Sequence, residues 1–470
     1  MRITQYRDGL AASVTQEQDY YPEVQGEIPA GLRGTLYRNG PGRFELGGVR
    51  KRHLLDGDGL IQAFSFGPDG RVRYRNRFVR TAKFQREQQA GRFVLPTWST
   101  RAPGGILKNF GHRIQTQAGV TVFCKHGRLY AFDEIGLPYG LNPKDLETLS
   151  EQHLGPPDQK LDFKAHTKTD PTNGRWALIS FEYGRRNYIH LVEHGADLQL
   201  LSHQRLEVPR SVYVHDWFLS ERYALVLLHP AIFSPLRYLS GAYSYMDSVR
   251  WKPDDGNLLM VIDRQGERQP VFLEAPSRFM WHSLNAYEEG GKIIADFVSY
   301  AAPDHFLGQD AALRTVMQGR EGLQQHSGLL TRYIVDPVPR KLTETLLSDR
   351  NCEFPMLDSR HSTRRHQVGY FTTAPHPTVF HQGLARIDVQ SGVEQVADLG
   401  EDTQLGEPIF VAEPGAGPNQ GWLLTVGLDG KQGKSFLGIF RAQSLADGPV
   451  ARVLLNHPTP LSFHGDWHRA

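Results

Sequence analysis

The sequence is poor in cysteine and in net charge. Only two of its 470 residues are cysteines, Cys124 and Cys352, which excludes a disulfide framework and any zinc or iron–sulfur site built on cysteine. Its 53 basic and 51 acidic residues leave a formal charge of +2, so we expect no nucleic-acid partner and favour a neutral or apolar one. This cysteine usage fits a reducing, cytoplasmic location.

Long apolar runs are also missing. The first residues, MRITQYRDGLAASVTQEQDYYPEV, lack the apolar core of a signal peptide, and no apolar run reaches the roughly 18 residues that a membrane-spanning helix requires. We therefore expect a protein that is soluble or bound to a membrane only at its surface.

What the sequence does contain is a succession of short strand-like segments, among them GRLYAFDE, GRWALISFEY, RYALVLLH, NLLMVIDR and GWLLTVGLD. Each is rich in β-branched or aromatic residues and is bounded by Gly, Pro, Asp or Asn. Helical periodicity is scarce, and 47 glycines and 29 prolines supply turns. The pattern predicts an all-β protein, interpreted as one β-propeller-like domain over residues 1–470. A two-sheet sandwich is the alternative that periodicity leaves open.

Two segments interrupt this pattern and are expected to be capping insertions, at about 85–117 and 229–251. The second, HPAIFSPLRYLSGAYSYMDSVRW, combines apolar and aromatic side chains around Phe233 with Arg237 and Arg250. An exposed apolar face here would suit a membrane surface or the entrance for an apolar substrate, and packing of the insertion on the domain is the alternative.

Four of the 20 histidines stand beside strand-like apolar residues, in DFKAHTKTDP, VYVHDWFLS, RFMWHSLNAYEE and LSFHGDWH. They are His166, His215, His282 and His464. Imidazole is a good ligand for divalent iron, and ligands supplied by different strands are widely spaced, so the lack of HExxH does not exclude a metal. Taken singly, each is more often a core residue than a ligand.

Three glutamates occupy comparable places at the ends of apolar strands: Glu134 in YAFDEIGLPYG, Glu353 in NCEFP and Glu407 in LGEPIFV. A metal-bound histidine usually donates its second ring N–H to a carboxylate, which makes the ligand more basic. Burying an unpaired carboxylate is costly, so these positions are candidates for that role, and an exposed strand end is the alternative for each.

Taken in order, several motifs resemble the carotenoid cleavage oxygenase family, and most closely its bacterial and cyanobacterial apocarotenoid oxygenases. The resemblance covers nearly the whole chain, through GTLYRNGPGRFELGG, GRLYAFDEIGLPYGLNPKDLETL, AHTKTDP, VHDWFLSERYALVL, WHSLNAYEEGGKII, CEFPMLDSR, GEPIFVAEPGAGPNQGWLLTV and FHGDWH. It implies a seven-bladed β-propeller, with loops and short helices capping the metal-bearing face over an apolar tunnel.

The resemblance also implies a site. Fe(II) would be held on the propeller axis by His166, His215, His282 and His464, with O₂ as the co-substrate. Three of these would each be held by a glutamate. The implied pairs are Glu134 with His215, Glu353 with His282, and Glu407 with His464.

The chain departs from the family at two places beside the first glutamate. Relatives carry ANTN where this chain has AGVT, which puts Val120 in place of a threonine beside the iron. Stilbene-cleaving relatives place a phenol-binding lysine directly before the glutamate, and apocarotenoid relatives an aromatic residue, whereas this chain has Asp133.

We therefore expect a non-haem Fe(II) oxygenase that splits a conjugated C=C bond of a carotenoid or apocarotenoid with O₂, giving aldehyde or ketone products. The polyene would lie against Tyr213, Trp281, Phe354 and Val120. The cleavage requires no protein acid or base, and none is nominated. Two alternatives stay open: a dioxygenase that cleaves stilbenes or other phenolic alkenes, and a metal-free propeller that only binds partners.

Overall fold

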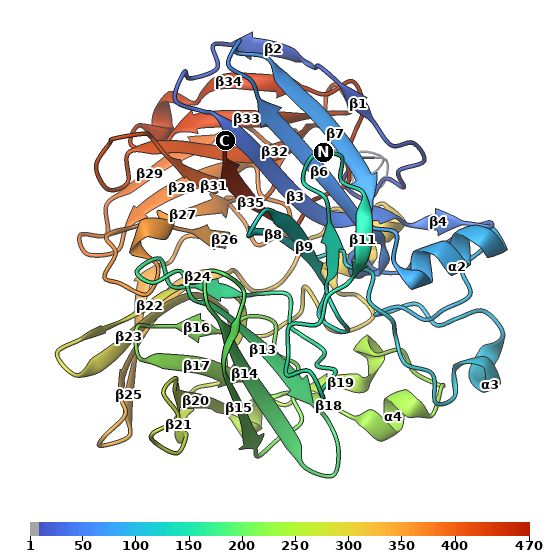
Figure 1. Ribbon diagram of the computed structural model, residues 1–470, viewed down its shortest axis with the longest axis vertical. Helices are drawn as coiled ribbons and strands as arrows, with labels where there is room; N and C mark the ends of the chain where they lie inside the picture. Colours follow the sequence, from blue (N-terminus) through green and yellow to red (C-terminus); the bar gives the residue numbers. More distant parts are fainter. Residues whose placement is uncertain (1–8) are drawn as a thin grey trace.

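Seven antiparallel sheets surround one central axis in the computed structural model, which describes residues 9–470 (Figure 1). This is the predicted seven-bladed β-propeller, and the sandwich alternative is wrong. The first sheet has the strand order β1 (Asp19–Tyr20), β7 (Val72–Phe78), β6 (Asp58–Phe66), β3 (Gly34–Arg43) and β35 (His464–Arg469). The second has the order β11 (Thr148–Glu151), β10 (Tyr139–Leu141), β9 (Arg128–Phe132) and β8 (Thr121–Lys125).

The next four sheets each have four strands in sequence order. The third sheet contains β12 (Lys168–Thr169), β13 (Trp176–Glu182), β14 (Asn187–His194) and β15 (Leu200–Val208). The fourth contains β16 (Phe218–Leu219), β17 (Tyr223–Leu228), β20 (Asn257–Asp263) and β21 (Val271–Ala275). The fifth contains β22 (Phe279–Glu289), β23 (Lys292–Tyr300), β24 (Leu329–Asp336) and β25 (Lys341–Ser348). The sixth contains β26 (Cys352–Met356), β27 (Val368–Thr373), β28 (Gly383–Asp388) and β29 (Glu394–Asp398).

Both ends of the chain take part in closing the ring. The seventh sheet has the order β2 (Glu23–Gly26), β34 (Pro449–Leu454), β33 (Lys434–Arg441) and β32 (Gly421–Asp429), which pairs with β30 (Thr403–Leu405) and β31 (Ile409–Ala412). N-terminal β2 thus completes the last sheet, while C-terminal β35 pairs with β3 in the first. Pairing both ends leaves the ring without a gap between its first and last blades.

The apolar pattern of each strand follows its place in a blade. Strands buried on both faces read as nearly continuous apolar runs, such as YALVLL in β17. Outer strands alternate, as in KLTETLLS of β25, where one face meets solvent. Separate apolar clusters fill the spaces between neighbouring sheets. The strands of one blade are therefore fixed by packing against the next.

Residues outside the sheets gather on one side of the ring (Figure 1). Near 85–117 they form α2 (Ala82–Ala90) and α3 (Gly105–Asn109), and near 229–251 they form β18 (Ala231–Phe233), α4 (Pro235–Leu239) and β19 (Val249–Trp251). Trp98, Phe233 and Tyr245 from these segments belong to one buried cluster with Tyr213 and Trp281 of the propeller. The two insertions thus cover the propeller next to the candidate site.

Further short elements in the described part of the chain are β4 (Glu45–Leu46), β5 (Val49–Arg50), α5 (Ala312–Thr315) and six 3-10 turns at Leu54–Asp56, Met246–Ser248, Pro253–Asp255, Val316–Gln318, Ser359–His361 and Leu445–Asp447.

Close backbone contact at Gly59 sets the position of the segment that carries Val120. Gly59 N donates to Gln117 O at 2.9 Å, and a Cβ atom on Gly59 would lie 2.2 Å from Ala118 O. Because Gln117 O and Ala118 O are backbone atoms, they cannot move aside as the end of a flexible side chain would.

Gly59→Ala should therefore lower the free energy of unfolding by about 2 kcal/mol through overpacking. Gly417→Ala is the matched control, since a Cβ there meets nothing closer than 3.8 Å. It should change the free energy of unfolding by less than about 0.5 kcal/mol. Thermal unfolding followed by circular dichroism measures both, and equal unfolding temperatures for the two variants would contradict the close contact.

Candidate metal centre

The four candidate histidines come from the innermost part of four different sheets. His166 lies two residues before β12, His215 lies three residues before β16, His282 lies within β22, and His464 opens β35. The third, fourth, fifth and first sheets therefore supply one imidazole each. His215, His282 and His464 are buried residues, and His166, of intermediate exposure as a residue, turns its ligand atom into the same buried cluster.

Their Nε2 atoms lie close together around one point. His215 Nε2 lies 3.0 Å from His166 Nε2 and 3.2 Å from His282 Nε2, which in turn lies 3.2 Å from His464 Nε2. All four potential ligand atoms lie within 4.8 Å of one another. An imidazole bond to a divalent first-row metal is about 2.1 Å long, as for zinc, which places neighbouring ligands of an octahedral ion about 3.0 Å apart. The spacing fits one such ion.

Each of the other three sheets supplies a glutamate to this centre. Glu134 follows β9 in the second sheet, Glu353 lies in β26 of the sixth, and Glu407 lies between β30 and β31 of the seventh. Every blade thus contributes one histidine or one glutamate near the axis.

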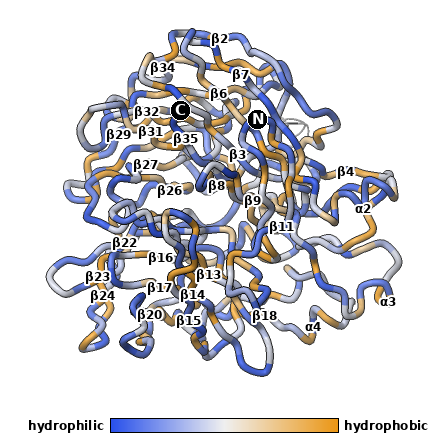
Figure 2. The backbone as a smooth tube through the Cα atoms, viewed as in Figure 1, coloured by the Kyte–Doolittle hydropathy of each residue, from blue (hydrophilic) through white to orange (hydrophobic). Residues whose placement is uncertain are grey.

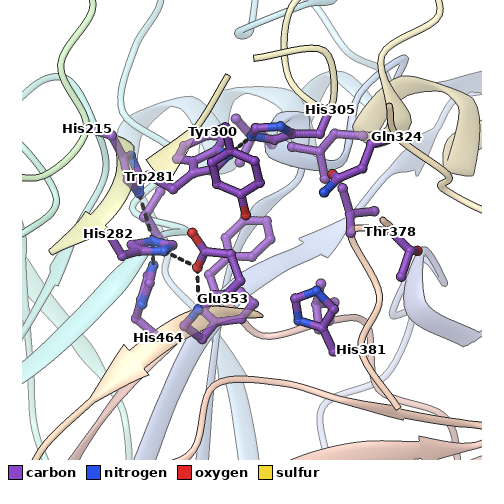
Figure 3. A pocket seen from close by; sticks show the side chains of 17 residues that line it. His215, Trp281, His282, Tyr300, His305, Gln324, Glu353, Thr378, His381 and His464 are labelled. Carbon is purple, nitrogen blue, oxygen red and sulfur yellow. Dashed lines mark hydrogen bonds and ion pairs between the residues drawn. The ribbon is translucent and has the colours of Figure 1, made fainter. Parts of the chain in front are cut away.

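The glutamates contact the ring nitrogens that face away from the cluster. Glu134 Oε1 lies 2.8 Å from His215 Nδ1. Glu353 Oε2 lies 2.6 Å from His282 Nδ1 (Figure 3). Glu407 Oε1 lies 2.9 Å from His464 Nδ1. The structure therefore brings together all seven residues that the sequence nominated. Glu288 and Glu289, the carboxylates nearest His282 in sequence, lie elsewhere: Glu288 accepts from Arg222 N at 3.0 Å, and Glu289 pairs with Arg365.

This arrangement determines which nitrogen of each paired ring carries the proton. A carboxylate only accepts hydrogen bonds, so Nδ1 of His282 and Nδ1 of His464 are the protonated donors, and Nε2 of each of these rings carries a lone pair. These two lone pairs then face each other, with the nitrogens 3.2 Å apart in a buried place. A cation at the centre removes this repulsion, and the donor set of neutral imidazoles suits a divalent transition metal.

The environment lowers the pKa of His166, His215 and His464, whereas at His282 the charge of Glu353 outweighs burial and raises the pKa. Burial, followed by the neighbouring imidazoles, lowers the pKa of His166 and of His215 well below the usual range. Burial alone would raise the pKa of Glu353 and of Glu407, but the contacts with His282 and His464 outweigh it and lower both. Glu134 differs, because burial raises its pKa to about 7 despite the opposing charge of Lys164.

Buried cations hold two of the glutamates in place. Arg38 Nη1 donates to Glu407 Oε2 at 3.0 Å and to Glu407 O at 3.1 Å. Lys164 Nζ donates to Glu134 Oε2 and to Glu134 O, both at 3.3 Å. These bonds orient the carboxylates that in turn orient the imidazoles.

A cavity lies directly beside the cluster. Its wall includes His215, His282 and His464 together with Val120, Trp281 and Phe354, and further polar residues lie on the side away from the histidines (Figure 3). Three of the four predicted tunnel residues therefore line it. Tyr213 does not: it is buried behind the wall, with its ring 5.0 Å from that of Phe306 and its hydroxyl 3.3 Å from His215 Nδ1.

Phe354 adopts a strained backbone conformation next to this cavity. Its φ is +50°, a region that non-glycine residues seldom occupy. Phe354 N donates to Glu353 Oε2, and its ring stacks on His282 with centroids 5.3 Å apart. The strain is offset by contacts that orient Glu353 and cover one face of the imidazole.

Some residues of the site could not be nominated from the sequence. Asp216 accepts from Ser283 N at 2.7 Å and pairs with Lys168 Nζ at 2.7 Å, which fixes β16 against β22 beside two of the histidines. Its position directly after His215 was the only signal for it. Lys164, His305 and Gln324 stand in unremarkable loop or strand contexts, and no motif separates them from other polar residues.

The fold and the cluster together define a β-propeller protein whose four axial histidines could hold a metal ion. The profile of the family described as retinal pigment epithelial membrane protein matches residues 11–469. The chain is 32% identical to the apocarotenoid-15,15'-oxygenase of Synechocystis sp. over 97% of this chain and 94% of that protein. It is 28% identical to the isoeugenol monooxygenase of Pseudomonas nitroreducens over 95% and 94%.

A crystal structure of the cobalt-substituted Synechocystis apocarotenoid oxygenase matches with a TM-score of 0.92 and 30% identity, covering 99% of this chain and 98% of that one. The chain belongs to the retinal pigment epithelial membrane protein family, which includes carotenoid cleavage oxygenases. The resemblance seen in the sequence is therefore confirmed.

Glu353→Gln should weaken binding of a divalent metal by about 10- to 100-fold, because His282 loses the carboxylate that orients it and raises its basicity. Titration of the metal-free protein with cobalt, followed by absorbance, measures the affinity. Glu289→Gln is the control, since this exposed residue pairs only with Arg365 on the surface. Unchanged cobalt affinity in Glu353→Gln would show that the contact does not support metal binding.

Proposed function

We propose that this protein is a non-haem Fe(II) oxygenase that cleaves a conjugated C=C bond of an apocarotenoid or carotenoid with O₂. The observation that carries the proposal is the convergence of four buried imidazoles beside an apolar cavity. His166, His215, His282 and His464 would hold the iron. Four ligands leave two positions of an octahedral ion open, where the metal would supply activation of O₂.

The chain's own residues would orient the metal ligands and bind the substrate. Three carboxylates keep the Nε2 lone pairs of their imidazoles directed at the metal, and Trp281 and Phe354 offer flat apolar faces to an extended conjugated chain beside it. Burial of the centre excludes bulk water. Alkene and O₂ together contain every atom of two carbonyl products, so no net proton transfer is needed. This accounts for the lack of a nominated acid or base.

A metal-free binding module is disfavoured by the same geometry. Without a cation, the Nε2 lone pairs of His282 and His464 would remain in repulsive contact inside the protein, which is costly in a buried site.

The central experiment is iron analysis of protein purified without oxygen, followed by addition of O₂ and an apocarotenal. We expect about one iron per chain and O₂-dependent bleaching of the polyene absorbance. His282→Ala should lose iron and bleaching together, because it removes a ligand from the middle of the cluster. Bleaching by an iron-free protein, or none by the iron-loaded one, would refute the proposal.

A phenolic alkene is the second candidate substrate, favoured by a separate observation. A second cavity of about 980 Å³ is lined by Glu134 and Lys164 together with aromatic side chains, including Tyr183 and Tyr245. The Lys164 ammonium is a hydrogen-bond donor that suits a phenol oxygen. Asp133 cannot play this part, since its carboxylate accepts from Trp98 Nε1 and from two backbone amides. Faster cleavage of isoeugenol or a hydroxystilbene than of an apocarotenal would favour this candidate.

We further propose that the protein is cytoplasmic and docks on a membrane surface through α3 and α4. Leu107 is 91% exposed, Leu236 is 85% exposed and Phe110 is 68% exposed. The two helices adjoin, since Gly111 N donates to Leu239 O at 2.9 Å, and both lie on the outer side of the cap (Figure 2). Leu236 also lines the 980 Å³ cavity, so the exposed face borders its opening. An apolar substrate could then pass from lipid into the protein.

No helix among residues 9–470 has the length and apolar character needed to cross a bilayer. Docking would therefore depend on the exposed side chains just named.

The double variant Leu107→Asp, Leu236→Asp should lose binding to vesicles of phosphatidylcholine and phosphatidylglycerol in a flotation assay. Two charges then replace apolar groups that would enter the interface. Leu346→Asp in β25 is the matched control, because Leu346 is also an exposed leucine but lies far from the cap (Figure 1). Equal flotation of both variants and the parent protein would exclude this docking face.

A further inference from the structure

Trp281 forms part of the cavity wall directly beside the histidine cluster. Its ring centroid lies 4.4 Å from that of His215, with the ring planes at 87°, and 4.6 Å from that of Phe306. Figure 3 shows it between His215 and His305. These ring contacts hold the indole in place, but its one polar atom, Nε1, needs a partner of its own when buried. Which edge of the indole faces the cavity therefore depends on where that partner lies.

The partner of Trp281 Nε1 is His305. Trp281 Nε1 donates to His305 Nε2 (Figure 3). An indole nitrogen carries a hydrogen and only donates, so His305 Nε2 accepts and the proton of the neutral imidazole is on Nδ1. Burial lowers the pKa of His305 to about 4, and the ring is therefore neutral and able to accept at neutral pH.

His305 is itself held from the side away from the indole. It is 2% exposed, and its ring centroid lies 4.5 Å from that of Tyr300 and 5.7 Å from that of Phe279. Its backbone oxygen accepts from Leu313 N at 3.0 Å. His305 belongs to the segment that joins β23 to β24, outside the sheets. This segment, and not the ring of blades, thus supplies the acceptor for the indole.

We infer that His305 is a positioning residue for the cavity wall, which fixes the orientation of the Trp281 indole by accepting the hydrogen bond from its Nε1. With this N–H engaged, Trp281 presents carbon atoms to the substrate. Without the acceptor, the buried N–H would be unpaired, which is costly, and the indole would lower that cost by turning the N–H toward the cavity. The inference rests on the proposed oxygenase function and adds to it a residue that acts through Trp281.

The first test separates the acceptor from the size of the side chain. His305→Leu removes the acceptor, whereas His305→Gln places an amide oxygen there. In the iron-loaded protein we expect kcat/KM for an apocarotenal to fall by about 10-fold in His305→Leu and to stay within about 3-fold of wild type in His305→Gln. His376→Leu makes the same change at an exposed histidine and should keep the wild-type value. Equal losses in the Leu and Gln variants of His305 would overturn the inference.

A double-mutant cycle tests whether His305 acts through Trp281. Trp281→Phe removes the donor and keeps an aromatic ring in the wall. In that background His305→Leu should change kcat/KM by less than about 2-fold, because the hydrogen bond is already absent. The same loss of about 10-fold in both backgrounds would show that His305 acts independently of Trp281 and would overturn the inference.

A third measurement needs neither substrate nor iron. In protein loaded with diamagnetic zinc, the indole N–H resonance of Trp281 is assigned by its loss in Trp281→Phe. We expect this proton resonance to move upfield in His305→Leu, where the hydrogen bond is lost, and to stay near its wild-type position in His305→Gln. An unchanged resonance in His305→Leu would overturn the inference alone. The expected shift, found together with a wild-type protein that does not bleach an apocarotenal, would refute the proposed oxygenase function and still support the role of His305 in orienting Trp281.

Discussion

The hydrogen bond from an imidazole Nδ1 to a buried carboxylate is the interaction on which the centre depends. It fixes the tautomer, and so obliges the opposite nitrogen to present a lone pair. It occurs at His282 and His464, where it directs two Nε2 lone pairs at each other and favours a cation between them, and at His215 Nδ1 lies 2.8 Å from Glu134 Oε1. Each carboxylate needs partners of its own, which Arg38 and Lys164 supply at two of the three positions. The orientation of the candidate metal ligands thus depends on residues that lie outside the histidine cluster.

The seven-sheet ring allows all seven residues of the centre to lie around one axis. Each blade brings one inner strand to the axis, and the chain uses four of these places for histidine and three for glutamate. Because His464 opens the C-terminal strand, its position depends on the pairing of β35 with β3. The centre is therefore incomplete until the ring closes. Formation of the site and completion of the fold are one event in this architecture.

The sequence predicted the parts that repeat or that carry a motif. Alternating and continuous apolar runs indicated strands, and seven residues in strand-end contexts were enough to nominate the centre once the family resemblance was recognised. Distances along the chain could not pair Glu353 with His282, because Glu288 and Glu289 are far closer in sequence. Their strand β22 carries them outward from the axis, whereas the next blade returns Glu353 to it. Which glutamate contacts which histidine is therefore determined by the order of the blades in the ring and not by the local sequence.

Polar residues of the cavity wall were harder to predict for a physical reason. His305 and Gln324 are single polar side chains in irregular segments, and each has one buried hydrogen-bonding atom without a partner among residues 9–470. An unmet hydrogen bond is a feature of three-dimensional surroundings and leaves no trace in spacing or composition. Tyr213 shows the converse, since its strand context indicated the tunnel wall while packing places Trp281 and Phe306 in front of it. The histidines of the cluster are thus constrained by the ring, whereas several polar residues of the cavity wall lie in loops that the ring does not constrain.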